Sequence, residues 1–396
     1  MVSIATIFGT RPEAIKLAPV IQHLHQHTNQ FRTIVAVTAQ HREMLDQVLS
    51  LFDIRPDFDL DIMRPNQTLF QVTTRALQGL EQVLNECQPD LVMVQGDTTT
   101  AFVAALAAYY RQIPVAHVEA GLRTFDKYQP FPEEVNRSMI SVMTDLHFAP
   151  TPLARQNLLQ SGIAVENIYV TGNTVIDALL SQVQPDYAFE EAPLSHLNFK
   201  QRRVILVTAH RRENFGRPMR NICQAVRRIV DTLPDVEVVF SVHRNPNVRA
   251  EVQRILSSAD RVHLLEPLDY LPFIQLMNRA TLILSDSGGV QEEAPSLGVP
   301  VLVLRNVTER PEGIDAGTLR LVGTDPDVIV STALQLLTDE AAYLQMAQAA
   351  NPYGDGQASQ RIVAVLAQFF KVNGDISSPM TSGTEIFDKE EATLSA

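Results

Sequence analysis

Short runs of β-branched and aliphatic residues alternate with longer helical patterns along almost the whole chain, and this alternation restricts the possible folds more than any other feature. Apolar runs of this length are typical of parallel strands that are buried on both faces. Helical patterns such as Pro12–His27 and Thr98–Tyr110 separate them, so we expect an α/β fold with helices on both faces of parallel sheets. The predicted strands are Ser3–Phe8, Thr33–Val37, Leu91–Val94, Val115–Val118, Val204–Val207, Val236–Phe240, Val262–Leu265, Leu282–Leu284 and Val301–Leu304.

A polar stretch with two prolines interrupts this alternation near the middle of the chain, which indicates two doubly wound, Rossmann-like domains joined by a connection. The last helical pattern follows the strong turn signal Tyr353-Gly354-Asp355-Gly356. The predicted parts are a first domain (1–181), a connection (182–201), a second domain (202–357), a C-terminal helix (358–372) and an acidic tail expected to be disordered (373–396).

The charge balance excludes several classes of partner. The 396 residues include 32 Lys and Arg against 45 Asp and Glu, a formal net charge of −13. This argues against binding to nucleic acid or to an anionic membrane. No apolar run approaches the roughly 18 residues of a transmembrane helix, and the N-terminus lacks the basic region of a signal peptide. Cys87 and Cys223 have no partner spacing for a disulfide framework or a zinc site, so we expect a cytoplasmic protein without a metal.

Polar residues follow the predicted strands, and in an open α/β sheet ligands bind beyond the carboxyl ends of the strands. Arg11 and Lys16 come after Ser3–Phe8, near the start of a helical pattern. The positive end of the helix dipole disfavours cations there, so we predict that Arg11 contacts a phosphate or diphosphate. A surface ion pair is the alternative.

Three carboxylate sites fall at the same edge of the first domain: Asp97, Glu119 and the pair Glu133-Glu134. Each alone has a structural explanation, since Asp97 could cap a helix and two acids in a first helical turn complement its dipole. Together they are harder to explain as structure. Crowding is expected to raise the pKa of at least one of them, which suits a general acid or base.

The second domain offers an anion site. His210, Arg211 and Arg212 follow one strand, and Ser287-Gly288-Gly289 lies between a strand and a helix, where its backbone N–H groups suit phosphate oxygens. The same residues could equally form a simple turn. Glu293 could accept the ribose hydroxyls, as the acid of a Rossmann domain does. The chain has no Walker A, GxGxxG or HExxH motif, so an ATPase, a dinucleotide oxidoreductase or a zinc hydrolase is not indicated.

These segments resemble the non-hydrolysing UDP-N-acetylglucosamine 2-epimerases of bacteria, and the resemblance runs from about Ile4 to about Leu366. The segments that carry it are FGTRPEAIK (8–16), TAQHREMLDQVL (38–49), GDTTT (96–100), HVEAGLR (117–123), FPEEVNR (131–137), TGNTVIDALL (171–180), HRRENFG (210–216), SDSGGVQEEAPSLG (285–298), TERPEG (308–313) and NPYGDGQAS (351–359).

The resemblance implies two domains facing a central cleft, as in glycosyltransferases of the B type, with the C-terminal helix crossing back to the first domain. It implies reversible conversion of UDP-N-acetylglucosamine (UDP-GlcNAc) to UDP-N-acetylmannosamine (UDP-ManNAc) by elimination and re-addition of UDP, without a cofactor, as a supply for cell-envelope polysaccharide. The positions that match the family's catalytic residues are Asp97, Glu119, Glu133 and His210. Those that match its UDP-sugar contacts are Arg11, Lys16, Phe273, Ser287, Gly288, Gly289, Glu293 and Arg310, together with Asp97, Glu119 and His210. Leu268 departs from the family, whose members can have Gln there.

The family also implies a homodimer and a second, activating UDP-GlcNAc. The matching positions are Gln40, Arg211 or Arg212, and His243. Asn66 departs from relatives that carry a basic residue nearby. The alternatives are a glycosyltransferase of the same fold, a hydrolysing epimerase that releases free sugar, and a non-catalytic UDP-sugar sensor.

Overall fold

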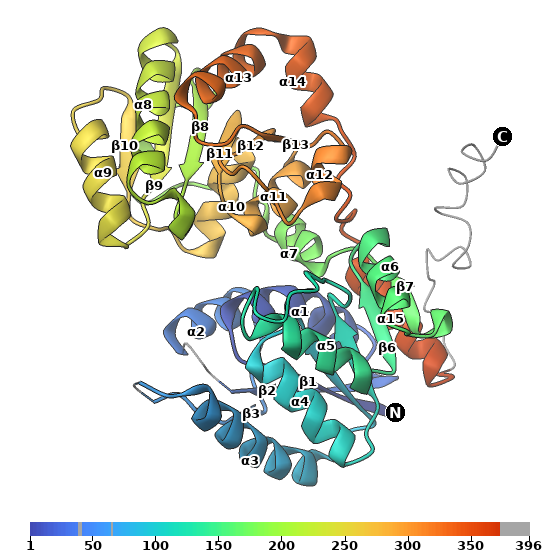
Figure 1. Cartoon of the computed structure of the whole chain (residues 1–396). Coiled ribbons are helices and arrows are strands. Elements are labelled where there is room, and N and C mark those ends of the chain that lie inside the picture. The colour runs from blue at the N-terminus through green and yellow to red at the C-terminus, as the bar shows by residue number, and fades with distance from the viewer. Residues whose placement is uncertain (39–41, 65, 373–396) are drawn as a thin grey trace, which may run out of the picture. The chain divides into compact units, whose positions relative to one another are not determined.

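The computed structural model describes residues 1–38, 42–64 and 66–372. Its contacts divide the chain into two units (Figure 1). Each unit has its own hydrophobic core. The first unit comprises Met1–Ala178 and the described residues from Gly354 onward, and the second comprises Leu179–Tyr353. The predicted tail, 373–396, lies outside the described residues.

The first unit is built on a parallel sheet with the strand order β3-β2-β1-β4-β5-β6-β7. Its central strands are buried along almost their whole length, which explains their continuous apolar sequences. The strands are β1 (Val2–Phe8), β2 (Phe31–Val37), β3 (Phe58–Asp59), β4 (Leu91–Gln95), β5 (Val115–Val118), β6 (Leu146–Ala149) and β7 (Ile168–Val170).

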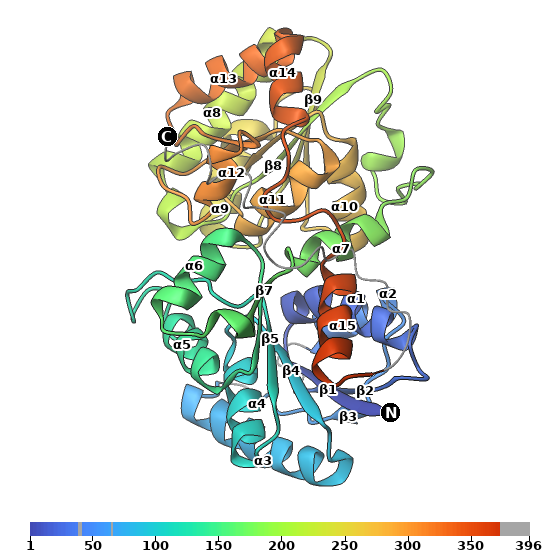
Figure 2. The ribbon, with the colours of Figure 1, turned by 90° about the vertical axis from the view of Figure 1, so that its right-hand side faces the viewer.

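Helices connect these strands. They are α1 (Arg11–His25), α2 (Arg42–Leu51), α3 (Leu69–Cys87), α4 (Thr99–Tyr110), α5 (Glu133–Met143), α6 (Pro152–Gln160), the 3₁₀ turn η1 (Val165–Asn167) and α7 (Thr174–Gln182), which continues into the second unit. The chain returns at its end as α15 (Ala358–Phe369), which packs beside α1 (Figure 2).

The second unit repeats the plan with a parallel sheet in the order β10-β9-β8-β11-β12-β13. The strands are β8 (Arg203–Thr208), β9 (Val236–Ser241), β10 (Val262–Leu265), β11 (Leu282–Ser285), β12 (Val301–Val303) and β13 (Leu319–Leu321). The helices are η2 (Leu194–His196), η3 (Arg212–Asn214), α8 (Arg217–Thr232), α9 (Pro246–Leu256), α10 (Tyr270–Arg279), α11 (Gly288–Glu293), η4 (Ala294–Leu297), α12 (Pro311–Asp315), α13 (Pro326–Thr338) and α14 (Glu340–Ala347).

The predicted α/β fold with doubly wound parallel sheets is therefore confirmed, and all nine predicted strands are present. Four strands were not predicted: β3, β6, β7 and β13. Each is only two to four residues long, and β3 and β13 are also partly exposed at sheet edges. β12 is equally short but was recognised because its run is wholly apolar, whereas β3 and β13 each carry a charged residue, Asp59 and Arg320.

Residues 182–201, which the sequence suggested as a connection, belong to the second unit. Two side chains of α10 hold this stretch: Gln275 bonds Gln182 and Gln184, and the Arg279 guanidinium donates to the Tyr187 carbonyl. The chain instead passes between the units inside α7, after Ala178, and again at Gly354.

In both sheets the strand order reverses once, between β1 and β4 in the first unit and between β8 and β11 in the second. At such a point the loops after two neighbouring strands diverge to opposite faces, and ligands of open α/β sheets bind there. Arg11, Asp97, His210 and the Ser287–Gly289 segment follow these four strands. Other candidates come after neighbouring strands: Glu119 and Glu133 after β5, His243 after β9, Phe273 after β10 and Arg310 after β12.

Candidate functional site

In the first unit, Arg11 begins α1 directly after β1, and Asp97 follows β4. The alternative that Asp97 caps α4 does not hold, because the Thr98 side chain is the cap and accepts the Ala101 N–H at 3.1 Å. The Asp97 carboxylate is therefore available for another purpose. Gly9, just after β1, allows close packing against the first turn of α4, since a Cβ there would lie 2.6 Å from the Thr100 hydroxyl oxygen.

Glu119 is buried at the end of β5, and donors from three segments surround its carboxylate. Lys16 Nζ of α1 lies 2.5 Å from Oε1, and Asn173 Nδ2 donates to the same oxygen at 3.1 Å. Gln95 Nε2, at the end of β4, donates to Oε2. Lys16, predicted as a UDP contact, thus forms an ion pair with a candidate catalytic carboxylate.

Asp97 is held by two consecutive residues of α5. Arg137 Nη2 lies 2.6 Å from Asp97 Oδ2, and Asn136 Nδ2 donates to the Asp97 carbonyl at 2.9 Å. Burial raises the pKa of Asp97, and the Glu119 and Glu133 carboxylates raise it further, whereas Arg137 and Lys16 lower it. The sequence predicted that crowding would raise the pKa of at least one carboxylate. The pKa of Asp97 is raised, but burial is the largest cause and the neighbouring carboxylates only add to it.

The two acids at the start of α5 differ in their surroundings. Glu133 is half-buried and contributes to the field at Asp97. Glu134 is buried, and its carboxylate accepts the backbone N–H groups of Thr124 at 3.0 Å and Phe125 at 3.2 Å. Glu134 therefore holds the preceding loop, which leaves Glu133 as the candidate for chemistry.

The second unit presents His210 after β8 and the Asp286–Gly289 segment after β11. Asp286 is fully buried and accepts the backbone N–H of His210 at 2.9 Å and that of Arg211 at 2.9 Å. It also accepts Asn214 Nδ2 at 2.8 Å. Burial lowers the pKa of His210, and of its charged neighbours Asp286 raises it while His243 and Arg211 lower it.

Two cations converge at the start of α11. A Cβ placed on Gly288 would lie 3.8 Å from Arg310 Nη2 and 3.9 Å from Arg211 Nη2. Ser287 is the N-cap residue of α11, but its side chain makes no capping hydrogen bond. Two guanidinium groups beside a glycine backbone form an arrangement that suits phosphate oxygens. In this structure the Arg310 guanidinium pairs with Glu292 of α11.

The other predicted residues of the second unit differ in their burial and in their neighbours. Glu293, the last residue of α11, is buried, and Phe273 of α10 is half-buried. His243 stacks on His210 with ring centroids 5.5 Å apart, so positions predicted for two different ligands touch. Arg212 is exposed, whereas Arg211 faces Gly288. Gln40 lies outside the described residues.

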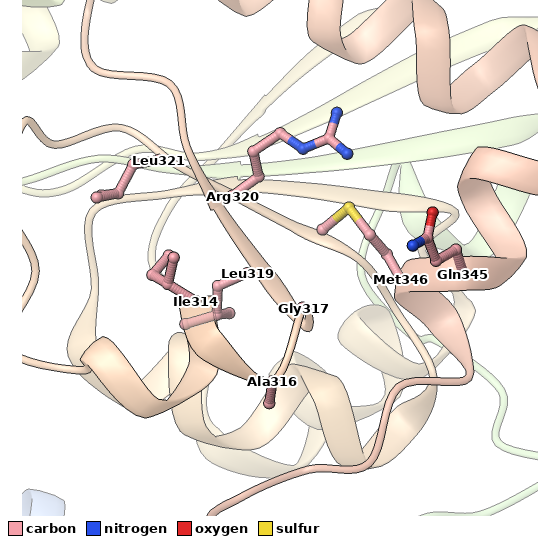
Figure 3. A pocket seen from close by; sticks show the side chains of 8 residues that line it. All are labelled: Ile314, Ala316, Gly317, Leu319, Arg320, Leu321, Gln345 and Met346. Carbon is pink, nitrogen blue, oxygen red and sulfur yellow. The ribbon is translucent and has the colours of Figure 1, made fainter. Parts of the chain in front are cut away.

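A separate pocket of about 470 Å³ lies at the β13 edge of the second sheet, between α12 and α14 (Figure 3). Its lining is mixed, with the apolar side chains of Ile314, Leu319 and Met346 beside the polar Arg320 and Gln345. None of the predicted site residues lines it, so it is not part of the candidate site.

Within residues 1–38, 42–64 and 66–372, no group of three His, Cys, Asp or Glu side chains could hold a metal ion. None of the helices in this described part of the chain is both long and apolar enough to cross a membrane.

Sequence reasoning did not assign roles to several residues that organise the site. They are Gln95, Asn136, Arg137, Asn173, Asn214 and Asp286. All except Gln95 lie inside segments that carry the family resemblance, and Gln95 comes directly before one. This location was the one feature of the sequence that could have marked them as functional.

A family model for UDP-N-acetylglucosamine 2-epimerase matches residues 22–367. The UDP-N-acetylglucosamine 2-epimerase of Yersinia pestis is 55% identical over 368 residues, which cover 92% of this chain and 98% of the relative. The crystal structure of the UDP-GlcNAc 2-epimerase of Neisseria meningitidis bound to UDP-GlcNAc is 50% identical, covers 92% of this chain and 100% of that chain, and superposes with a TM-score of 0.83.

A glycosyltransferase of kitacinnamycin is only 12% identical but has a TM-score of 0.66 over 92% of this chain, so it shares the fold alone. The Yersinia and Neisseria proteins are instead similar over nearly their full lengths at 50% identity or more. With the family model matching most of the chain, the conclusion is that this protein belongs to the UDP-N-acetylglucosamine 2-epimerase family.

Proposed function

We propose that this chain interconverts UDP-GlcNAc and UDP-ManNAc by inverting C2 of the sugar, without releasing free sugar. The observation that carries the proposal is the pair of carboxylates at the ends of β4 and β5, where Arg137 holds Asp97 and Lys16 holds Glu119. The name of the Yersinia relative supports the activity, and the ligand of the Neisseria structure supports the substrate.

The chemistry requires more than removal of a proton. No carbonyl group lies beside C2, so its proton is not acidic enough for a simple deprotonation. In the proposed reaction a base takes the C2 proton while the anomeric C1–O bond breaks, and the electron pair of that bond leaves with UDP. The product is 2-acetamidoglucal, with a C1–C2 double bond. UDP then adds back to C1 while an acid delivers a proton to the opposite face of C2.

The residues of the two units suit different parts of this reaction. Asp97, Glu119 and Glu133 supply the base and the acid. His210, Arg211 and Arg310 act on the diphosphate, where negative charge develops as the C1–O bond breaks. Arg11, Lys16 and the Ser287–Gly289 backbone complete the nucleotide-sugar contacts, with Phe273 beside the uracil and Glu293 at the ribose. The proposed steps balance without a metal or a redox cofactor.

Incubation of the pure protein with UDP-GlcNAc alone in deuterated water tests this function. The proposed reaction gives UDP-ManNAc with deuterium at C2. A hydrolysing epimerase would give free N-acetylmannosamine instead. A glycosyltransferase or a UDP-sugar sensor would leave the nucleotide sugar unlabelled, and either result would reject the proposal.

Three isosteric variants test the carboxylates. Asp97→Asn, Glu119→Gln and Glu133→Gln keep the side-chain volume but remove the ionisable group. We expect each to lower kcat by about 10²–10⁴-fold, the contribution of a positioned acid or base. Glu81→Gln, on the exposed side of α3, is the control. Near-normal turnover in all three variants would place the chemistry elsewhere. Glu134→Gln is not a suitable control, because Glu134 holds the Thr124 and Phe125 backbone.

We further propose that the chain forms a homodimer. Val135, Met139 and Val142 are exposed on α5 at helical spacing, and Tyr109 and Tyr110 are exposed at the end of the neighbouring helix α4. Apolar stripes of this kind mark interaction surfaces. Light scattering is expected to give the mass of two chains for the parent protein and of one chain for Val142→Glu.

A second UDP-GlcNAc is proposed to activate the enzyme through His243 and Arg211 or Arg212. The stacking of His243 on His210 supports this, because a ligand at His243 would act directly on a residue of the diphosphate site. Conversion of UDP-ManNAc alone is expected to show a lag that a trace of UDP-GlcNAc abolishes, and His243→Ala is expected to lose this response. Progress curves without a lag would reject the activation.

We place the enzyme in the cytoplasm, where it would supply N-acetylmannosamine units for cell-envelope polysaccharide. Both cysteines, Cys87 and Cys223, are free thiols, which fits a reducing compartment.

A further inference from the structure

Arg137 is one of the two cations described above in the carboxylate cluster of the first unit, and the other is Lys16. Arg137 lies on α5 and is 9% exposed, and its two terminal nitrogens face different carboxylates. Nη2 lies 2.6 Å from Asp97 Oδ2, and Nη1 lies 3.6 Å from Glu134 Oε2. Glu134 is itself fixed by the backbone N–H groups of the preceding loop, so it holds the guanidinium in place.

The surroundings of Asp97 would disfavour its charge without this cation. The charged groups that face Asp97 are Arg137 and Glu133 from α5, Glu119 from the end of β5 and Lys16 from α1. Lys16 is already paired with Glu119, at 2.5 Å. Burial and both glutamates favour the neutral acid, and Arg137 is the cation in direct contact with the carboxylate.

The same helix also fixes the backbone of Asp97. Asn136, the residue before Arg137, donates Nδ2 to the Asp97 carbonyl at 2.9 Å. Asp97 is therefore held at its carbonyl and at its carboxylate by adjacent residues of one helix. Glu133 begins that helix one turn earlier, so its position is coupled to that of Asp97.

We propose that Arg137 is a positioning residue that fixes both the orientation and the negative charge of the Asp97 carboxylate during the epimerisation. The inference rests on the proposed function. Arg137 acts through Asp97 and is not itself required to touch the sugar. Its planar guanidinium can hold one carboxylate on each terminal nitrogen, which a lysine ammonium cannot reproduce.

The test compares Arg137→Gln and Arg137→Lys with the parent protein in the rate of deuterium incorporation at C2, measured across pH. Without the guanidinium, one limb of the pH–rate profile is expected to move to higher pH by about 1 unit or more, while the other limb stays. The acidic limb is the one expected to move, because the proposal requires Asp97 to be ionised. A shift of the alkaline limb instead would mean that Asp97 acts as a protonated acid and would overturn the inference. Arg137→Lys is expected to shift this limb less, because a charge remains, and to lower kcat by about 10²-fold through misplacement.

Arg123→Gln is the matched control. Arg123 is also a partly buried arginine of this region, but it donates to Ser141 Oγ and to the Leu122 carbonyl, both at 2.9 Å. Its loss is expected to lower the melting temperature without moving either limb.

A uniform fall in rate at every pH in a folded Arg137 variant would mean a merely structural role and would overturn the inference. The inference would also be overturned if either Arg137 variant kept both the turnover of the parent protein and the two limbs of its pH–rate profile. Failure of the proposed function is distinguished from these results, because the parent protein itself would then incorporate no deuterium.

Discussion

Glu119 has a backbone φ of 64°, in the left-handed region that non-glycine residues rarely adopt. This conformation costs about 1–2 kcal/mol relative to an ordinary one. It turns the carboxylate at the end of β5 toward Lys16, Gln95 and Asn173, whose hydrogen bonds offset the cost. Strained residues of this kind cluster at functional sites, and here the strained residue is one of the candidate catalytic acids.

Gly121, two residues later, is expected to tolerate no side chain. Its φ is 96°, and a Cβ there would lie 2.2 Å from the Ala154 carbonyl oxygen. Gly121→Ala is expected to lower the free energy of unfolding by about 1–3 kcal/mol through overpacking, in addition to the backbone strain. Gly162→Ala is the matched control, because Gly162 has a φ of 83° but no atom within 4 Å of the added carbon. Urea unfolding of both variants separates clash from strain, and equal losses would contradict the packing argument.

His117 is expected to make the stability of the fold depend on pH. It is fully buried in β5, where its Nε2 lies 2.7 Å from the Gly96 carbonyl oxygen, and burial lowers its pKa from 6.5 to about 3. The unfolded chain binds a proton below about 6.5 that the folded protein does not, so acidification favours unfolding, by up to about 1.4 kcal/mol per pH unit down to about pH 3.

Urea unfolding across pH is the measurement, and His117→Gln is expected to flatten this slope. Exposed His196, changed to Gln, is the control and is expected to keep it. Glu13 and Asp177 have pKa values raised by burial, so their contributions fall as pH rises above the ordinary carboxyl range. The difference between the parent protein and His117→Gln isolates the histidine from these opposing groups, and identical slopes would refute the prediction.

At the scale of single residues, the sequence predicted the charged groups better than their partners. Asp97, Glu119 and Glu133 stand out as a set, because three carboxylate sites at one edge of a predicted sheet are harder to explain as structure than any one of them alone. Gln95 and Asn173 do not stand out, since an amide in a loop is unremarkable until the ends of β4 and β5 and the start of α7 come together. The positive φ of Glu119 leaves no trace in the sequence at all.

At the scale of elements, the central strands were predictable because they are buried on both faces and so carry continuous apolar runs. Short strands such as β3 and β13 were not, because pairing with a neighbouring strand, rather than their own composition, keeps them extended. The return of the C-terminal helix to the first domain was expected from the family resemblance alone, because it depends on contacts between distant parts of the chain that the pattern of a single helix does not encode.

The start of α15 offers a prediction at this scale. Asp177 of α7 accepts the backbone N–H groups of Ala358 at 3.2 Å and of Ser359 at 2.7 Å. Asp177→Ala leaves these buried donors unsatisfied and is expected to cost about 1–3 kcal/mol in the free energy of unfolding. Hydrogen exchange along α15 is expected to quicken. Asp325→Ala removes an exposed cap from α13 and is expected to cost about 1 kcal/mol. An equal or larger effect at Asp325 would contradict the role of Asp177.

At the scale of the whole molecule, the three candidate carboxylates lie in the first unit, whereas most of the candidate UDP contacts lie in the second, with Arg11 and Lys16 as the exceptions. The paired carboxylates belong to the first unit, whereas Arg211, Arg310 and Gly288 belong to the second. Binding of UDP and turnover are therefore expected to be separable by mutation.

Calorimetric titration with UDP tests this separation. Arg310→Lys is expected to raise the Kd for UDP by about 10-fold or more, the value of a hydrogen bond between charged groups. Asp97→Asn and Glu119→Gln are expected to leave this Kd nearly unchanged while lowering kcat by about 10²–10⁴-fold. Arg228→Gln is the control, because Arg228 is an exposed residue of α8 that pairs with Asp327 of α13. Because Arg310 also pairs with Glu292, the melting temperature of its variant must be followed. If the Kd for UDP changed in the carboxylate variants but not in Arg310→Lys, the assignment of UDP binding to the second unit would be wrong.

The return of α15 to the first unit has a consequence for the order in which a ribosome lets this protein fold. The second unit, Leu179–Tyr353, is an insertion within the first, and its strands and core are all synthesised before α15 emerges. Domains usually fold in the order of their synthesis. Here the unit that begins first must wait for its last helix to cover α1, so the second unit can finish ahead of it. A chain that ends at Tyr353 and has been released from the ribosome is expected to carry a folded second unit beside an unfinished first one.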